Sequence, residues 1–206
     1  MSVITISRQF GAGGKTLTQK VAEKIGYQIA HEEIIEQMAS MANVSTKGIQ
    51  AFETEADGFI DKNTGMLAPK RFMDHIFDPG KKYMDGSQYI QLLHAIIPAI
   101  ADRGNVIILG RGAQFILKGR QDTHHILMIA DTKDCIAFMQ KNYNLSASDA
   151  ERAVAKQSKR RVKLMKLFHH ESYDAAWNYD LVINMSKIDM DSAVDLVSEL
   201  ATGPSA

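Results

Sequence analysis

The stretch Val3-Ile4-Thr5-Ile6-Ser7-Arg8-Gln9-Phe10-Gly11-Ala12-Gly13-Gly14-Lys15-Thr16 decides the fold of this chain. Its first four residues form a β-branched apolar run, which predicts a buried parallel strand. The next residues carry apolar side chains at helical spacing, at Leu17, Val21 and Ile25, and Gly26 is placed to end that helix. Glycines between a strand and a helix let backbone amides point at phosphate oxygens, and the helix N-terminus adds partial positive charge. We therefore predict a phosphate-binding loop.

The residues assigned to this loop are Gly11, Ala12, Gly13, Gly14, Lys15 and Thr16. The lysine would neutralise the terminal phosphates of ATP, and the threonine hydroxyl would hold Mg²⁺. Two registers stay open. In the motif G-x-x-x-x-G-K-[ST], Gly14-Lys15-Thr16 fit, but the first glycine position falls on Gln9. In the other register, Gly11-Ala12-Gly13 aligns with the G-S-G of nucleotide kinases and the lysine stands one residue late. The plainer alternative is a glycine-rich turn that binds no ligand.

Apolar runs alternate with amphipathic helical segments along the rest of the chain. Further strands are predicted at 27–30, 106–109, 125–130 and 181–184, with helices between them. Continuously apolar strands are typical of a parallel sheet covered on both faces, so we predict a three-layer α/β fold. Residues 43–87 carry turn signals and little periodicity, and we interpret them as an insertion within a single domain that spans 1–206.

Composition excludes several classes of protein. The chain has 206 residues, 45% hydrophobic and 23% charged, which is ordinary for a folded domain. Basic and acidic residues balance at 24 each, which argues against nucleic-acid binding as the main role. A single cysteine, Cys135, allows no internal disulfide and suits a reducing compartment. No apolar run approaches a membrane span and the N-terminus lacks a signal-peptide pattern, so we expect a cytoplasmic protein without a membrane partner.

A second candidate site is Gly110-Arg111-Gly112-Ala113, directly after the strand predicted at 106–109. In open α/β sheets, ligands bind at the carboxyl ends of the strands. An arginine between two glycines can place its planar guanidinium on a phosphate with two hydrogen bonds. The alternative is a tight turn with a solvated arginine.

A third candidate site is a basic run that begins after the capping signal of Ser146 and Asp149. Its members are Arg152, Lys156, Lys159, Arg160, Arg161, Lys163 and Lys166. Such runs are usually solvated helix faces. Phosphoryl transfer favours a functional interpretation, because charge spreads over the transferring oxygens and needs cationic groups that close over the site. We predict a lid at about 146–172.

Three stretches together resemble the cytidylate kinase-like family of P-loop nucleotide kinases. They are Ile6 to Gly14, Val106 to Ala113, and Tyr179-Asp180-Leu181-Val182-Ile183-Asn184, and their order and spacing match across nearly the whole chain. The resemblance implies a five-stranded parallel sheet, a helical insertion that binds a nucleoside monophosphate, and a lid. It also implies MgATP as donor and CMP or dCMP as acceptor.

The motifs and the resemblance together assign roles to single side chains. The acceptor would be bound by Gly110, Arg111 and Arg8, the donor phosphates by the glycine loop, and Mg²⁺ by Thr16 and Glu32. Glu32 stands where relatives often carry an aspartate. The catalytic cations would be Lys15, Arg152, Arg160 and Arg161.

The chain departs from the family pattern at the helix after Asp131 and in the lid. Residues 132–138 contain no arginine where relatives carry them. The lid pattern Asp-x-x-Arg reads Ser158-Lys159-Arg160-Arg161, which keeps the arginine and lacks the acid. We expect a phosphotransferase that acts on small molecules; the alternatives are a catalytically weakened nucleotide-binding relative and a kinase for another small metabolite. The sequence does not indicate an oligomeric state.

Overall fold

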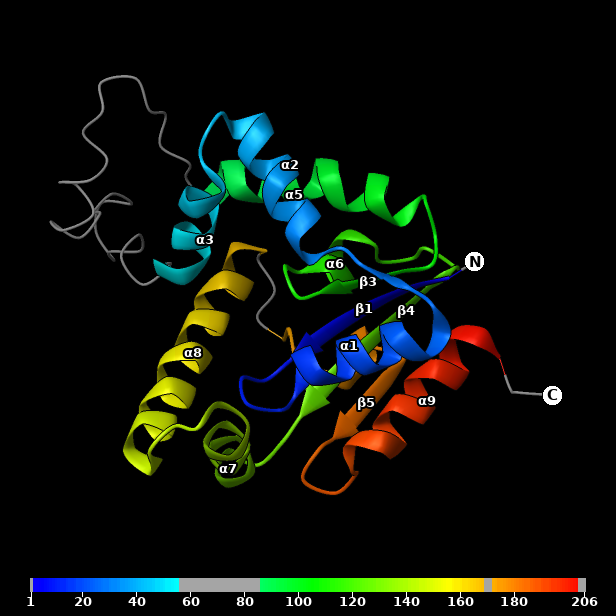
Figure 1. Ribbon diagram of the computed structural model, residues 1–206. Coiled ribbons are helices and arrows are strands. Elements are labelled where there is room, and N and C mark those ends of the chain that lie inside the picture. The colour runs from blue at the N-terminus through cyan, green and yellow to red at the C-terminus, as the bar shows by residue number, and fades with distance from the viewer. Residues whose placement is uncertain (1, 56–85, 169–171, 204–206) are drawn as a thin grey trace, which may run out of the picture. The chain divides into compact units, whose positions relative to one another are not determined.

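Figure 1 shows the computed structural model, which describes residues 2–55, 86–168 and 172–203. The chain divides into two compact units, of which the larger comprises residues 1–31 and 97–206 and the smaller residues 32–96. The predicted insertion at 43–87 falls within the smaller unit, and its residues 56–85 lie outside the described part.

A sheet of five parallel strands, in the order β2-β3-β1-β4-β5, forms the centre of the larger unit (Figure 1). The strands are β1 (Val3–Arg8), β2 (Gln28–Ile29), β3 (Val106–Leu109), β4 (Thr123–Ile129) and β5 (Leu181–Asn184). The predicted α/β fold is confirmed, although β2 is shorter than expected and β4 begins two residues earlier. In register, Ile6 of β1 is paired with Leu109 of β3 and with Ile126 of β4. The turns that follow β1, β3 and β4 therefore leave the sheet at the same edge.

Two helices, α1 (Gly14–Ile25) and α9 (Met190–Thr202), pack together and cover one face of the sheet (Figure 1). Their apolar stripes, with Leu17 and Val197 fully buried, share a core with Ile4 and Ile6 of β1. Side chains alternate between the two faces of a strand, so Ser7 points to the opposite face from Ile6. The other elements of the larger unit are α6 (Ala113–Ile116), α7 (Thr132–Tyr143), α8 (Ala147–Leu167) and η1 (Ala176–Asn178).

Helices α7 and α8 form a hairpin with its own small core (Figure 1). Cys135 and Val154 are among its buried residues, and Phe10 of the glycine-rich loop packs against it. The predicted capping signal at the start of α8 is confirmed, because the Asp149 amide donates to Ser146 Oγ at 3.1 Å. In the ranges that the structure describes, no helix is long and apolar enough to cross a membrane.

The smaller unit contains α2 (His31–Ala42) from residue 32, α3 (Thr46–Glu55) and the first part of α5 (Gly86–Ala101). The rings of Phe52 and Tyr89 pack with their centroids 4.9 Å apart, and the Tyr89 hydroxyl donates to Glu53 at 2.9 Å. Pro98 lies inside α5, which continues to its end at Ala101.

A candidate phosphate and nucleotide site at the carboxyl edge of the sheet

The glycine-rich stretch forms the turn between the end of β1 and the start of α1. Gly11 and Gly13 have φ angles of 88° and 82°, which L side chains rarely adopt. The Gln9 amide extends the strand ladder by donating to the Met128 carbonyl at 3.0 Å, and the Gln9 side chain accepts from the Ala130 amide at 3.0 Å. These bonds anchor the first part of the loop to β4.

The N-terminus of α1 is open to an anion. Its cap is Gly13, and no side chain in the described part of the chain caps it. The first amides of a helix have no intrahelical acceptor, so a phosphate can accept from them and gain from the helix dipole. Gly14, Lys15 and Thr16 form the first turn, and the side chain of Lys15 is exposed.

Gly11 is also a point of close approach between the loop and α7. A β-carbon on Gly11 would lie 2.8 Å from both the Cβ and the carbonyl oxygen of Cys135. Together with Phe10, which packs into the α7–α8 core, this contact holds the loop against the start of α7. Burial raises the pKa of the Cys135 thiol, which suits a packing role for this side chain.

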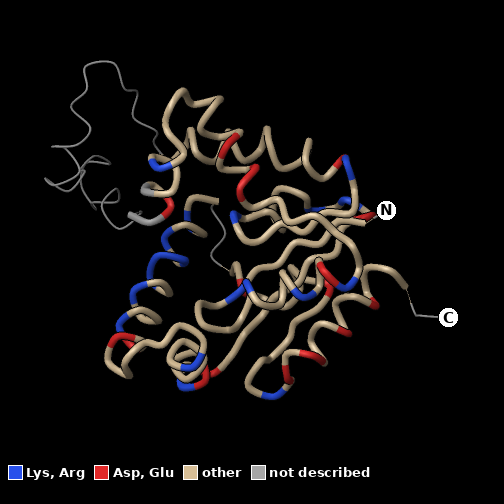
Figure 2. The backbone as a smooth tube through the Cα atoms, in the orientation of Figure 1, with Lys and Arg blue, Asp and Glu red and all other residues tan. Residues whose placement is uncertain are grey.

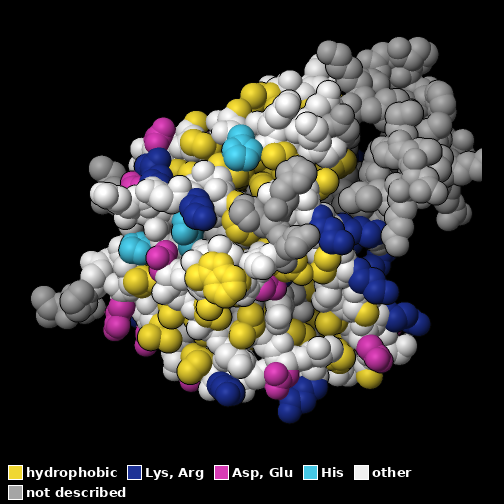
Figure 3. Space-filling view, turned by 180° about the vertical axis from the view of Figure 1, so that it is seen from behind, with side chains coloured by type: hydrophobic (Ala, Val, Ile, Leu, Met, Phe, Trp, Pro, Cys, Tyr) yellow, Lys and Arg dark blue, Asp and Glu magenta, His cyan; other side chains and the backbone are white. Residues whose placement is uncertain are grey.

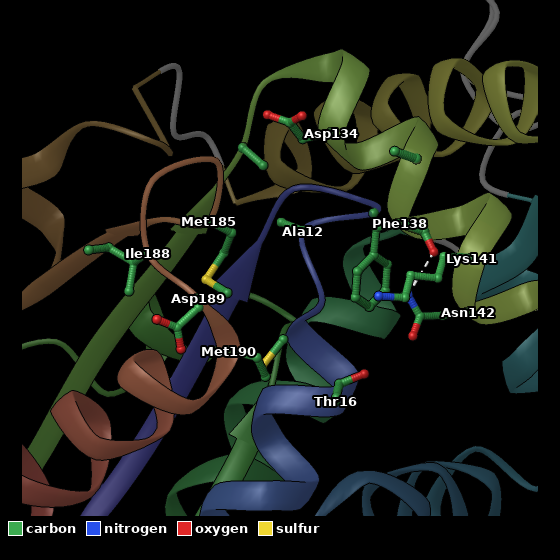
Figure 4. Close-up of a pocket in the computed structure, with 13 residues that line it drawn as sticks. Ala12, Thr16, Asp134, Phe138, Lys141, Asn142, Met185, Ile188, Asp189 and Met190 are labelled. Carbon is green, nitrogen blue, oxygen red and sulfur yellow. Dashed lines mark hydrogen bonds between the residues drawn. The ribbon is translucent and has the colours of Figure 1, made fainter.

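A cavity of about 430 Å³ opens directly beside the loop (Figure 4). It is lined by Gly11, Ala12, Thr16, Ala130, Asp134, Ala137, Phe138, Lys141, Asn142, Met185, Ile188, Asp189 and Met190. Phe138 and Met190 reach the loop itself, since a β-carbon on Gly13 would lie 3.3 Å from the Phe138 ring and 2.8 Å from Met190 Cε. The cavity thus joins the glycine-rich turn to an apolar wall with a few polar groups, an arrangement common in small-molecule sites.

The sequence did not predict this cavity. Its walls come from the glycine loop, from α7, from the segment 185–189 that joins β5 to α9, and from Met190 at the start of α9 (Figure 4). Apolar residues such as Phe138 and Met190 look like ordinary helix residues in the sequence. The sheet topology does indicate a site here, because the segments that follow the parallel strands β4 and β5 meet at the edge of the sheet where the glycine loop lies.

Arg8 and Gly110, both predicted to bind the acceptor, lie next to each other. A β-carbon on Gly110 would lie 2.1 Å from Arg8 Nη1, so the glycine leaves room for this guanidinium. The aliphatic part of Arg8 lies over Gly14, where a β-carbon would be 2.6 Å from Arg8 Cγ. Arg8 therefore spans from the glycine loop to the turn after β3.

Arg111 is buried, with 5% of its surface exposed, which excludes the solvated-arginine alternative. Its backbone has a φ of 56°. Its Nη1 lies 3.1 Å from His31 Nδ1 and also donates to the His31 carbonyl at 3.4 Å. His31 was not predicted, because these two residues are separated by 80 positions and only the pairing of β2 with β3 brings them together.

The basic run lies along α8 (Figure 2), and the side chains of its members differ widely in environment. Arg160 and Arg161 are partly buried, and 15% of the Arg161 side chain is exposed. It pairs with Asp174 and donates to Ser7 Oγ at 3.1 Å, which brings it to the end of β1. Arg160 donates to Gln157 at 2.6 Å. Arg152 pairs with Asp149 at 2.5 Å, with 72% of its side chain exposed.

The stripe that helical spacing predicted is largely a solvent-facing surface. Arg152, Lys156 and Lys159 are exposed, and Lys163 is partly buried. Figure 2 shows Lys and Arg positions spread along α8, and Figure 3 shows a group of Lys and Arg side chains at one side of the surface. Arg161 and its neighbour Arg160 are both partly buried, and Arg161 is the one that pairs with Asp174. Residues 169–171 at the end of the predicted lid lie outside the described residues.

Glu32, predicted to hold Mg²⁺ with Thr16, is the first residue of the smaller unit, so its metal role stays a prediction. Thr16 lines the cavity beside the glycine loop. No group of three or more His, Cys, Asp or Glu side chains in the described ranges is arranged to hold a metal ion.

Comparison with known proteins places this geometry in a family. The sequence matches the cytidylate kinase-like family over residues 3–187. The chain belongs to the cytidylate kinase-like family. No curated protein matches it.

Solved structures share the fold of this cytidylate kinase-like protein. One is an uncharacterized protein from Eubacterium ventriosum, with a TM-score of 0.65 and 18% identity, covering 99% of this chain and 100% of the other. Another is a shikimate kinase from Bacteroides thetaiotaomicron, with a TM-score of 0.51 and 12% identity, covering 97% of each chain. Family and fold together support a P-loop kinase, that is, a phosphotransferase that binds a nucleotide.

Proposed function

We propose that this protein transfers the γ-phosphoryl group of MgATP to a pyrimidine nucleoside monophosphate, CMP or dCMP, in the cytoplasm. The observation that carries the proposal is the cavity of about 430 Å³ that begins at Gly11, Ala12 and Thr16 and continues between Phe138 and Met190. One end offers backbone amides and a helix N-terminus to phosphates. The other end offers apolar and polar side chains to a nucleoside.

The donor would bind along this cavity. The amides of Gly11 to Lys15 would donate hydrogen bonds to the phosphate oxygens, and the exposed Lys15 ammonium would neutralise their charge. The base would lie against Phe138, with Lys141 and Asn142 at the α7 side. Thr16 and Glu32 would hold Mg²⁺, which when bound neutralises charge on the β- and γ-phosphates.

The acceptor would bind on the other side of the loop, at Arg111, Gly110 and Arg8. A nucleoside monophosphate is already an anion, so its attack needs no general base. What it needs is orientation and relief of charge repulsion between two phosphate groups. Arg8 spans from Gly14 to Gly110, which suits a cation that faces both phosphates.

The remaining work is charge stabilisation in the transition state. Arg161, Arg152 and Arg160 are all carried by α8, and Arg161 contacts Ser7 at the end of β1. The choice of CMP or dCMP as acceptor rests on the membership of this chain in the cytidylate kinase-like family.

A coupled assay of ADP release tests the proposal. The protein is incubated with MgATP and each of CMP, dCMP, UMP, AMP and GMP, and the phosphorylated product is identified by chromatography. We expect turnover with CMP or dCMP above the others, and loss of turnover in Lys15→Ala. Turnover with a purine monophosphate in preference would refute the acceptor. No product with any acceptor, from a folded protein whose melting temperature MgATP raises, would refute the transfer step.

A nucleotide sensor is the second candidate. It is favoured by the first turns of α7, where residues 132–138 hold no arginine and Asp134 and Phe138 line the cavity instead. A sensor would bind MgATP, show the melting shift, and release no ADP. Adding phosphorylated and hydroxylated metabolites to the same panel separates a sensor from a kinase of another small molecule.

A further inference from the structure

The guanidinium of Arg161 is fixed by two acceptors near the end of β1. Its Nη1 donates to Asp174 Oδ2 at 2.6 Å, its Nη2 donates to the other carboxylate oxygen of Asp174, and Nη2 also donates to Ser7 Oγ at 3.1 Å. The pair is largely shielded, with 15% of the arginine and 30% of the aspartate side chain exposed. A two-point pair of this kind sets the plane of the guanidinium as well as its position.

The loop that carries Asp174 is itself anchored. The Tyr173 ring lies 4.9 Å from Arg161 Cζ. The Tyr179 hydroxyl donates to the Tyr173 carbonyl at 2.6 Å and accepts from Gln114 Nε2 at 3.2 Å. Burial raises the pKa of Tyr179, so its hydroxyl stays protonated and able to donate. These bonds tie the loop to α6 and to the residues that precede β5.

The last turns of α8 are docked beside the acceptor arginine. A β-carbon on Gly112 would lie 2.3 Å from the Phe168 ring, so this glycine, next to Arg111, leaves space for that ring. Phe115 of α6 also packs near Phe168, with ring centroids 6.1 Å apart. The helix segment that carries Arg161 therefore contacts the end of β1 and the turn after β3, which are the two edges of the proposed transfer site.

We propose that Asp174 is a positioning residue that orients the Arg161 guanidinium toward the transferring phosphate groups. The inference rests on the proposed function. Asp174 and Ser7 use three of the five N–H donors of the guanidinium, which leaves two for phosphate oxygens. An arginine oriented before the substrate arrives stabilises developing charge without reorganisation.

A double-mutant cycle tests the coupling. Asp174→Asn removes the charge at nearly constant shape, and we expect kcat to fall roughly 10- to 100-fold with a smaller change in KM for ATP, as for a misplaced catalytic group. In the Arg161→Ala background the same change should cost no further activity, because Asp174 acts through that arginine. Asp174→Glu should recover part of the loss. The matched control is Asp195→Asn, which breaks an exposed pair with Lys24.

Two results would overturn the inference. If Asp174→Asn lowers kcat equally in the wild-type and Arg161→Ala backgrounds, the aspartate acts independently of the arginine. If Asp174→Asn raises kcat, the pair restrains Arg161 instead of positioning it. Thermal denaturation of each variant shows whether the fold is intact, and Asp174→Glu keeps the test valid if Asp174→Asn is poorly folded.

A readout that needs no activity separates this inference from the proposed function. In a bidentate ion pair, rotation of the guanidinium is hindered, so Arg161 should give resolved Nη signals by NMR, identified by their loss in Arg161→Lys. We expect these signals to disappear in Asp174→Asn and to persist in Asp195→Asn. If the wild-type protein is inactive but shows the resolved Nη signals, the proposed function is refuted and the Arg161–Asp174 pair is still supported. Signals that persist in Asp174→Asn would refute the pairing itself.

Discussion

Replacing Gly11 by alanine perturbs the glycine loop without removing any functional group. The φ of 88° at this position places an L residue in a left-handed conformation that costs roughly 1–2 kcal/mol. The new β-carbon would lie 2.8 Å from the carbonyl oxygen and 3.0 Å from the Cα of Cys135. These are backbone atoms of α7 and cannot rotate away, so the loop must move. Overpacking of this kind costs about 1–3 kcal/mol, and the sum is about 2–5 kcal/mol.

Gly26→Ala is the matched control. Gly26 ends α1 with a φ of 71°, and a β-carbon there would have nothing within 4 Å. It should therefore carry only the backbone cost of roughly 1–2 kcal/mol. The difference between the two variants isolates the collision with α7.

Thermal denaturation with and without MgATP measures both effects. At a ligand concentration about 100 times its Kd, binding stabilises the native state by about 2.7 kcal/mol. For a chain of this size each kcal/mol shifts Tm by roughly 2–4 °C, so the wild-type protein and Gly26→Ala should both gain about 5–10 °C. Gly11→Ala should melt lower than Gly26→Ala and lose most of the ATP-dependent gain. If Gly11→Ala keeps the full gain, the loop does not hold the phosphates in the way described.

Three further predictions follow from single side chains. Arg111→Ala should weaken acceptor binding and leave ATP affinity nearly unchanged in calorimetric titrations, and equal losses for both ligands would contradict its assignment. Arg161→Ala should lower turnover by about 100-fold or more with a smaller change in KM for ATP, because its contact strengthens as charge spreads in the transition state. Burial lowers the pKa of His125 in the folded protein below its usual value. As the pH drops from about 7.5 to about 5.5, the unfolded chain therefore binds a proton at this histidine before the folded chain does, and the free energy of unfolding falls. In melting curves, His125→Gln should lose less stability over this range than the wild-type protein, and an identical pH dependence would refute the burial argument.

The sequence predicted the features that depend on local patterns. β1 and the turn after it are encoded within one continuous stretch, by β-branched residues followed by glycines. The Ser146 cap and the parallel α/β fold were equally accessible, because capping and apolar alternation are short-range signals.

The features that the sequence did not reveal all depend on long-range pairing. The cavity wall combines Phe138 of α7 with Met190 of α9, and neither residue type marks a site. Helical spacing grouped Arg152 with the lysines of the predicted lid. It could not show that Arg161 is held at the end of β1, because this depends on Asp174 and Ser7. Likewise, Arg111 contacts His31 because β2, which ends two residues before His31, pairs with β3.

In the proposed function, the turn after β1 holds the phosphates of a donor nucleotide while Arg111 holds the acceptor. A crystal structure with MgATP, or a non-hydrolysable analogue, together with CMP tests both halves at once. We predict triphosphate oxygens on the amides of Gly11 to Lys15, the donor base in the cavity between Phe138 and Met190, and the CMP phosphate on the guanidinium of Arg111. Density for either nucleotide elsewhere, with the glycine loop free of phosphate, would contradict the account.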